Sequence, residues 1–297
     1  MLDGRKDPSE GLWGWLHATS RARAADAWPV GTVLRGFSTN AEAIGGGDSE
    51  GARPGIMVTV TYADITTRER NRLKRWLQNR RLDDALVPLS VPTGSWSGRC
   101  LDFGGGDAAL SRRVLERSPG ASAVCYEPSE SIRLEADAAC ASSGVRIVGK
   151  LAELSGPFDF ITCCEVFEHL PPEESAQALH DLGRLVADSG RIVIGVPNEI
   201  FSVGLMKGLF RMTRRYGKYD AKWGTVLPAA LGRPRQNRPV LALDGLNFIF
   251  PHTGFDYRRL RVQIREAGFR IQRQYGSPFR ISWPAINSEV YLVLVKV

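Results

Sequence analysis

The sequence predicts an α/β fold in which helices cover both faces of a doubly wound, mainly parallel sheet of seven strands. From residue 99 onward, short apolar runs alternate with amphipathic runs of helical period, and a glycine-rich turn follows the first apolar run. The chain ends in two strand-like segments with no helix between them. Strands joined through helices run parallel, whereas the last two segments suit an edge hairpin. We therefore expect an antiparallel C-terminal strand.

The composition is that of an ordinary globular chain. With 297 residues, 43% of them hydrophobic, the chain is long enough for one large domain with additions. No apolar run approaches the roughly 18 to 20 residues of a membrane span, and the first residues lack the apolar core of a signal peptide. The five cysteines include no CxxC pair, so a disulfide framework is not expected. These features predict a cytoplasmic protein.

Residues 1–56 and 57–95 differ in the periodicity of their apolar residues. Residues 1–56 keep neither a helical nor a strand period, which predicts a poorly ordered tail, and Met57 is an alternative start. The domain is then expected to span 57–297. Within it, segment 57–95 contains a basic run whose apolar residues lie one or two turns apart, which is typical of an amphipathic helix.

After residue 95 the expected elements follow in a regular order. Strands are predicted at 99–103, 122–127, 145–149, 159–164, 191–197, 269–276 and 289–297. Helices are predicted at 109–118, 131–143, 173–188 and 255–268. The chain between the fifth strand and the last helix, residues 200–245, is expected to form a helical lid insertion.

The strongest chemical signal is the turn after the first strand. Gly104, Gly105 and Gly106 let the backbone turn sharply and approach a ligand closely. The GxGxxA spacing also suits a dinucleotide, so a nicotinamide-dependent oxidoreductase is an alternative. Glu127 ends the second strand, where a carboxylate can accept both hydroxyls of a ribose. Asp102, two residues before the glycines, suits a cofactor with an ammonium group better than one with a pyrophosphate.

Four segments together carry a family resemblance. In order and spacing, LDFGGGD, CYEP, FDFITCCEVFEHL and SGRIVIGVPN resemble the class I S-adenosylmethionine-dependent methyltransferases, and among these the small-molecule methyltransferases with an EHL motif. The resemblance covers residues 95–198 and, more loosely, 245–297. It implies a Rossmann-like fold and S-adenosyl-L-methionine as cofactor.

The resemblance also implies roles for individual residues. Asp102 and the glycines would hold the methionine part, Glu127 the ribose, and Pro128, Leu151 and Ala152 the adenine, with Cys164 at the end of its strand beside the cofactor. The implied cofactor-binding residues are Asp102, Gly104, Gly105, Gly106, Glu127, Pro128, Leu151, Ala152 and Cys164. Two positions depart from the family pattern: Leu151 often has an acid in its place, and Ala108 a third glycine.

The segment after the fourth strand suggests the acceptor side. Glu165, Glu168 and His169 are spaced so that one helical turn could bring them together. This pattern resembles the metal site of ubiquinone-pathway O-methyltransferases and small-RNA 2′-O-methyltransferases, and two carboxylates with an imidazole suit Mg²⁺ or Mn²⁺. The alternative is that Glu168 and His169 only form hydrogen bonds, without a metal. His252, together with His169, is a candidate general base.

Segment 201–240 carries the excess positive charge. It holds nine basic residues and a single acid, Asp220, whereas the whole chain has a net charge of +7. Basic residues mixed with Leu, Phe and Met favour a lid over an acceptor that is itself anionic, or a peripheral membrane contact through 201–223. No recognisable nucleic-acid module accompanies the segment, so nucleic acid is not the expected partner.

Together these patterns predict an S-adenosylmethionine-dependent methyltransferase that acts on an oxygen of a small, lipid-linked or sugar-linked acceptor. Two alternatives remain beside it. One is an NAD(P)-dependent oxidoreductase, although no Tyr-x-x-x-Lys pair stands near the later strands. The other is a catalytically silent methyltransferase-like subunit that binds a partner through its basic face.

Overall fold

The computed structural model describes residues 72–89, 96–243 and 246–297. The predicted tail 1–56 and residues 57–71 lie outside the described residues, so the tail and the domain boundary stay predictions. The described part of the N-terminal helical segment is helix α3 (Arg72–Ala85), which is followed by the short 3-10 helix η2 (Val87–Leu89).

Seven strands form one sheet in the order β3-β2-β1-β4-β5-β9-β8. Their bounds are β1 Arg99–Phe103, β2 Ser122–Tyr126, β3 Arg146–Val148, β4 Phe158–Cys164, β5 Val186–Pro197, β8 Phe269–Ser277 and β9 Glu289–Lys296. Neighbouring strands are parallel, except that β9 runs antiparallel to both β5 and β8. The predicted mainly parallel, doubly wound sheet with an antiparallel C-terminal strand is confirmed.

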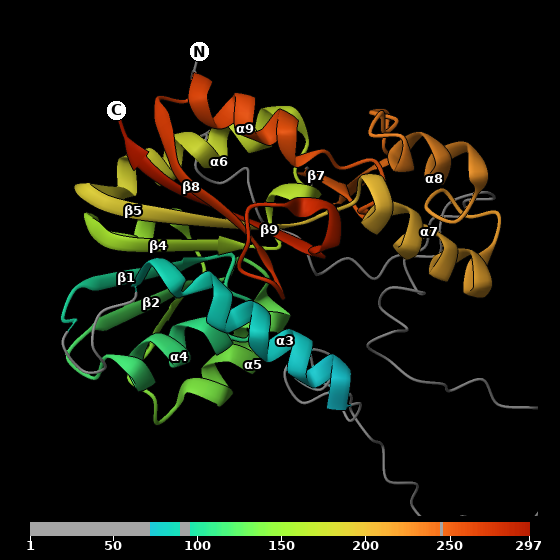
Figure 1. Ribbon diagram of the computed structural model, residues 1–297. Helices are drawn as coiled ribbons and strands as arrows, with labels where there is room; N and C mark the ends of the chain where they lie inside the picture. Colours follow the sequence, from blue (N-terminus) through green and yellow to red (C-terminus); the bar gives the residue numbers. More distant parts are fainter. Residues whose placement is uncertain (1–71, 90–95, 244–245) are drawn as a thin grey trace, which may run out of the picture.

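The helices cover both faces of this sheet (Figure 1). Helices α3, α4 (Ala109–Arg117) and α5 (Glu130–Cys140) pack on one face, and α6 (Pro172–Leu185) and α9 (Tyr257–Glu266) on the other. Each face has its own apolar core, because α4 and α6 present apolar residues at helical spacing toward the strands. The sheet is therefore buried on both sides, as a parallel sheet requires.

One predicted boundary is wrong. The helix expected at 173–188 ends at Leu185, and Val186 already pairs with Phe158 of β4 before a register shift. The helical spacing of apolar residues continues through Leu182, Leu185 and Val186, although Val186 already belongs to β5. Periodicity cannot separate the two states over so short a run.

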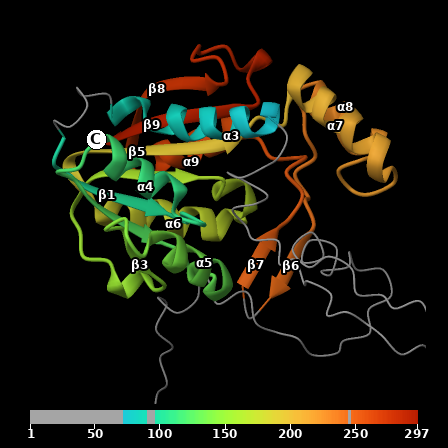
Figure 2. The ribbon, with the colours of Figure 1, turned by 90° about the horizontal axis from the view of Figure 1, so that it is seen from below.

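The chain between β5 and α9 forms a separate substructure. Helix α7 (Phe201–Arg215) and helix α8 (Trp223–Ala230) make a helical hairpin, and β6 (Val240–Leu243) and β7 (Leu246–Ile249) make a two-stranded antiparallel sheet. Both stand beyond the end of the large sheet (Figure 2). The insertion is thus partly β, unlike the all-helical insertion that was expected. Among the described residues, no helix is long and apolar enough to cross a membrane.

Candidate active site

A cavity of about 280 Å³ opens where the parallel strands end. The loop after β1, the end of β4, helix α3 and Tyr291 of β9 surround it. The lining residues are Gln78, Arg81, Leu82, Ala85, Asp102, Gly104, Gly105, Gly106, Asp107, Ala109, Leu110, Cys164, Glu165, His169, Gly195 and Tyr291. This is the edge at which open α/β sheets bind their ligands. The cavity therefore joins the predicted cofactor loop to the predicted acceptor side.

The glycine loop is held in a conformation that side chains would obstruct. Gly104 and Gly106 have φ values of +73° and +57°, a region that favours glycine. The amides of Gly104 and Gly105 both donate to the carbonyl of Tyr126, at 2.8 and 3.1 Å. A Cβ on Gly105 would lie 2.7 Å from Oδ2 of Asp102. The loop can thus pass close to Asp102 only because it is made of glycine.

Ala108 departs from the family pattern at a position where glycine would fit better. Its φ is +56°, in the left-handed region, and its amide donates to the carbonyl of Gly105 at 3.0 Å. A left-handed conformation costs an alanine roughly 1 kcal/mol relative to glycine. The departure at Ala108 therefore leaves the shape of the turn intact at the cost of some strain.

Asp102 is a buried carboxylate without a cationic partner among the described residues. Its Oδ1 accepts from Oγ1 of Thr162 at 2.9 Å, and its Oδ2 accepts from Oγ of Ser111 at 3.2 Å. Burial raises the pKa of Asp102 to about 6, against these two hydrogen bonds. At neutral pH the side chain is largely ionised inside the cavity. A ligand with a positively charged group would relieve this uncompensated charge.

Glu127 fixes the other side of the glycine loop. Its Oε2 accepts from the amide of Gly106 and its Oε1 from the amide of Ser129, both at 2.9 Å. Burial raises the pKa of Glu127 to about 7. Each carboxylate oxygen keeps a second lone pair, so both can still accept a hydroxyl. The arrangement therefore fits a ribose placed beside the loop.

The predicted adenine-side residues, like Glu127 itself, lie outside the cavity lining. Pro128 follows Glu127, whose amide donates to the carbonyl of Val148 in β3 at 3.0 Å. Leu151 and Ala152 belong to the 3-10 helix η3 (Leu151–Glu153), in which Leu151 is buried and Ala152 exposed. Cys164, in contrast, does line the cavity.

Glu165 pairs with Arg81 and does not belong to the group of possible metal ligands that contains Glu168 and His169. Glu165 has a φ of +58°, and its Oε1 lies 2.5 Å from a guanidinium nitrogen of Arg81 in α3. Burial would raise the pKa of Glu165, but the charge of Arg81 outweighs it and lowers this pKa to about 2. Glu165 is thus an ionised partner of Arg81.

His252 takes the place that the sequence analysis gave to Glu165. One ligand atom from each of Glu168, His169 and His252 lies within 4.8 Å of the others. Glu168 is fully buried in the 3-10 helix η4 (Phe167–His169), and neither of its carboxylate oxygens has a hydrogen-bond partner in the described part of the chain. Burial, together with Glu165, raises its pKa. A carboxylate in this state is one that a cation or a proton donor would satisfy.

The tautomer of His169 follows from its one hydrogen bond. Its Nδ1 lies 2.9 Å from the carbonyl of Ile249 in β7, and a carbonyl can only accept. Burial lowers the pKa of His169 to about 3, so the ring is neutral and its proton sits on Nδ1. The lone pair of Nε2 then faces Oε1 of Glu168 at 3.9 Å. Phe248 stacks on the ring with a centroid distance of 4.5 Å and fixes its plane.

Sequence reasoning missed the contribution of α3. Arg81 reaches Glu165 and also lies 3.6 Å from Glu289. The hydroxyl of Tyr291 donates to the carbonyl of Arg81 at 2.8 Å, and that of Tyr275 donates to the carbonyl of Asp84 at 2.6 Å. The two tyrosine hydrogen bonds join residues about two hundred positions apart. The basic amphipathic run was visible in the sequence, but its partners were not.

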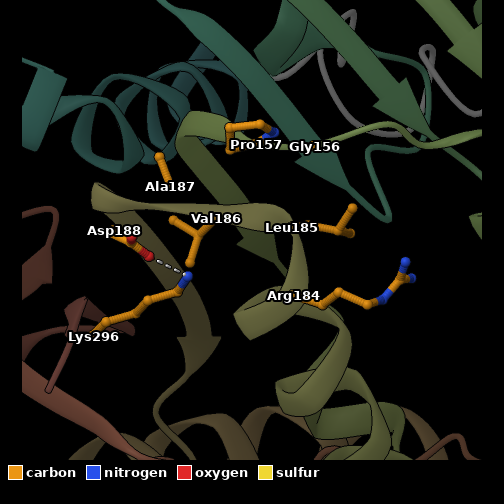
Figure 3. Close-up of a pocket in the computed structure, with 8 residues that line it drawn as sticks. All are labelled: Gly156, Pro157, Arg184, Leu185, Val186, Ala187, Asp188 and Lys296. Atoms are coloured by element: carbon orange, nitrogen blue, oxygen red, sulfur yellow. Dashed lines mark hydrogen bonds and ion pairs between the residues drawn. The ribbon is translucent and has the colours of Figure 1, made fainter.

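A second hollow, of about 400 Å³, lies at the opposite end of the sheet (Figure 3). It is lined by Gly156, Pro157, the start of β5 and Lys296, which pairs with Asp188 at 3.0 Å. It lies at the amino ends of the strands and contains none of the residues described above. The chemistry is therefore concentrated at the carboxyl ends.

A family model described as "Methyltransferase domain" matches residues 70–274, which is more than half of the chain. The chain belongs to this family. Its fold is that of the class I S-adenosylmethionine-dependent methyltransferases, and S-adenosyl-L-methionine is the cofactor. The finer assignment to the group with the EHL motif stays a prediction.

Solved structures agree with this methyltransferase fold. The chain is similar to the PH0226 protein of Pyrococcus horikoshii OT3, with 16% identity over 80% of this chain and 96% of that one and a TM-score of 0.53. It is also similar to a S-adenosylmethionine-dependent methyltransferase from Clostridium acetobutylicum ATCC 824, with 11% identity over 79% and 96% of the two chains and a TM-score of 0.50. No curated protein matches the sequence.

Proposed function

We propose that this methyltransferase transfers a methyl group from S-adenosyl-L-methionine to an oxygen of a small, lipid-linked or sugar-linked acceptor. One observation carries the proposal: His169 lines the same cavity as Asp102 and the glycine loop. A hydroxyl beside His169 is therefore within the same enclosed space as a cofactor on the loop. When bound, the cofactor supplies an electrophilic methyl group on a sulfonium.

Asp102 and Glu127 are the residues that would hold this cofactor. The uncompensated charge of Asp102 suits the ammonium of the methionine part, and the free lone pairs of Glu127 suit the ribose hydroxyls. The same charge at Asp102 would repel a pyrophosphate, which disfavours the nicotinamide alternative. Gly104, Gly105 and Gly106 allow the close approach, while Pro128, Leu151, Ala152 and Cys164 would border the rest of the molecule.

His252 is the candidate general base, and Nε2 of His169 would accept a hydrogen bond from the acceptor hydroxyl. Nε2 of His169 is an unprotonated acceptor, because Nδ1 is committed to Ile249. Burial lowers the pKa of His252 as well, so both rings are neutral and able to accept. Alignment of the acceptor hydroxyl and exclusion of water supply the rest of the rate enhancement.

The same three residues support a second candidate, a divalent cation such as Mg²⁺ or Mn²⁺ held by Glu168, His169 and His252. The observation that favours it is the buried Glu168 carboxylate, whose two oxygens lack a partner within the described segments. Titration with Mn²⁺, followed by electron paramagnetic resonance, tests this candidate. Binding that Glu168→Gln abolishes and the exposed control Glu153→Gln preserves would support the metal; equal binding by all three proteins would remove it.

The experiment for the main proposal is isothermal titration of the full chain with S-adenosylhomocysteine. We expect micromolar binding that Asp102→Ala and Glu127→Ala each weaken, while the control Asp159→Ala, a residue of β4 outside the cavity, preserves it. Binding of NADH in place of S-adenosylhomocysteine would overturn the proposal. Cofactor binding without methyl transfer to any screened acceptor would instead favour the silent subunit.

The role of an acceptor lid, which was predicted for the insertion 200–245, is proposed for the chain between β5 and α9, which includes β7. The support is that β7 carries Ile249 and Phe248, which fix the ring of His169. Neither the hairpin of α7 and α8 nor β6 and β7 contribute a residue to the cavity lining, but β7 contacts His169, which does line it. We therefore assign the lid role to β6 and β7. The helical hairpin needs a separate explanation.

A further inference from the structure

The helical hairpin formed by α7 and α8 exposes an unusual amount of apolar surface. Met206, Leu209 and Phe210 of α7 are 64%, 42% and 56% exposed. Trp223 and Leu227 of α8 are 51% and 49% exposed, and Leu231, just after this helix, is 68% exposed. The spacing within each set places its members on one side of its helix. Isolated exposed apolar residues are common, but a group of this kind marks an interaction site.

The exposed charges in the described part of this hairpin are all positive. Asp220, the only acid between 201 and 240, is buried and pairs with Arg215 and Arg211. Arg214, Lys222, Arg233 and Arg235, which lie in, between or just after the two helices, are exposed. The guanidinium of Arg214 lies 4.4 Å from the ring centre of Phe210, so cationic and apolar groups adjoin directly. The outer surface is therefore cationic and apolar together.

The hairpin is fixed to the body of the protein. Glu199, at the end of β5, receives two hydrogen bonds from Arg211, at 2.7 and 2.9 Å, and one from Lys207 at 3.2 Å. The two helices pack closely, because a Cβ on Gly208 would lie only 2.5 Å from a methyl group of Val226. The apolar groups are thus presented on a braced support that projects beyond the sheet (Figure 1).

We propose that the α7–α8 hairpin docks the protein on an anionic lipid surface. Apolar side chains enter the boundary between head groups and acyl chains, while Lys and Arg contact the lipid phosphates. In the described part of the hairpin the exposed charges are all positive, which complements an anionic surface, and rows of Met, Leu and Phe at helical spacing suit acyl chains better than the stacked bases of a nucleic acid. The hairpin starts at the carboxyl end of β5, the edge that holds His169. Together with the proposed function, this docking brings a lipid-linked acceptor to the site.

Co-sedimentation of the full chain with vesicles tests the proposal. We compare phosphatidylcholine alone with phosphatidylcholine that contains phosphatidylglycerol. We expect binding only to the anionic vesicles, weakened by salt, and lowered about tenfold or more by the double substitution Phe210→Ser and Leu227→Ser. Arg214→Ala with Lys222→Ala should also weaken it. The matched control, Leu134→Ser with Val262→Ser, removes equally exposed apolar residues from α5 and α9 and should leave binding unchanged.

Titration with S-adenosylhomocysteine on the same samples separates this proposal from the proposed function. Vesicle binding without cofactor binding would refute only the function, and cofactor binding without vesicle binding would refute only the docking surface. Equal losses in the hairpin and control variants would also refute the docking surface. Tighter binding to a duplex DNA probe, or a concentration-dependent dimer lost in the Phe210→Ser and Leu227→Ser variant, would assign the hairpin to nucleic acid or to a second copy of the chain.

Discussion

Replacement of Asp102 by asparagine should make the protein more stable and a poorer cofactor binder. Burial raises the pKa of Asp102 from its ordinary value of 3.8 to about 6. At about 1.4 kcal/mol per pKa unit, the ionised side chain destabilises the folded state by about 3 kcal/mol. Asparagine has the same shape and no charge, and the hydroxyls of Thr162 and Ser111 can rotate to suit it.

The size of the stability difference depends on pH. Because the folded pKa is raised, the favourable contribution of protonated Asp102 is fully present below about pH 4 and is lost as the pH rises through about 6. The Asp102→Asn variant has no ionisable group at this position, so its stability does not fall in this pH range for this reason. We therefore expect Asp102→Asn to exceed the wild type in free energy of unfolding by about 2 to 3 kcal/mol at about pH 8, and by little at about pH 4.

Urea denaturation of both proteins at these two pH values measures the difference in free energy of unfolding. Titration with S-adenosylhomocysteine measures the loss of cofactor affinity. Loss of a charged hydrogen bond to the ammonium should weaken cofactor affinity by roughly 10- to 100-fold. A variant that is less stable than the wild type at both pH values would refute the reasoning, because Asp102 would then be a favourable structural group. A stable variant with unchanged affinity would refute its role toward the cofactor.

Three further predictions concern the same region. Affinity for S-adenosylhomocysteine should rise with pH between about 5 and 8, because Asp102 and Glu127 ionise with pKa values of about 6 and 7; a flat calorimetric profile would contradict this. Ala108→Gly should raise the thermal midpoint, since removal of left-handed strain returns up to about 1 kcal/mol; a lower midpoint would show that the turn is not strained. Tyr291→Phe removes the hydrogen bond to Arg81 and should cost about 1 kcal/mol in urea denaturation and weaken cofactor binding; unchanged affinity would separate α3 from the cofactor site.

The sequence predicted the sheet because its signals are local. Each strand is a short apolar run bounded by turn residues, and the glycine loop carries its own conformational requirement. The same holds for Asp102 and Glu127, which lie at strand ends that the pattern located. The grouping of Glu168 with His169 was also local, since they are adjacent in the chain.

The remaining part of the site depends on contacts between distant segments. Glu165 forms an ion pair with Arg81, some eighty positions earlier in the chain. No local sequence pattern indicates that these two charges meet. His252 follows β7 in the chain, and β7 is held beside His169 by the hydrogen bond between His169 and the carbonyl of Ile249. This contact between distant segments brings His252 close to Glu168. The metal set Glu165, Glu168 and His169 stays a prediction, and the group of possible ligand atoms in the described residues is Glu168, His169 and His252. The β-hairpin in the insertion was missed because the basic residues dominated the pattern.

The two tyrosine hydroxyls that hold α3 have a consequence for the order in which the site can form. Tyr291 bonds to Arg81 across 210 positions of chain, and Tyr275 to Asp84 across 191. During synthesis, α3 emerges long before β8 and β9, the strands that carry its partners. The wall of the cofactor cavity that contains Arg81 is thus completed only after β9 has been made. A protein shortened before β9 would keep the glycine loop and still lack an enclosed site.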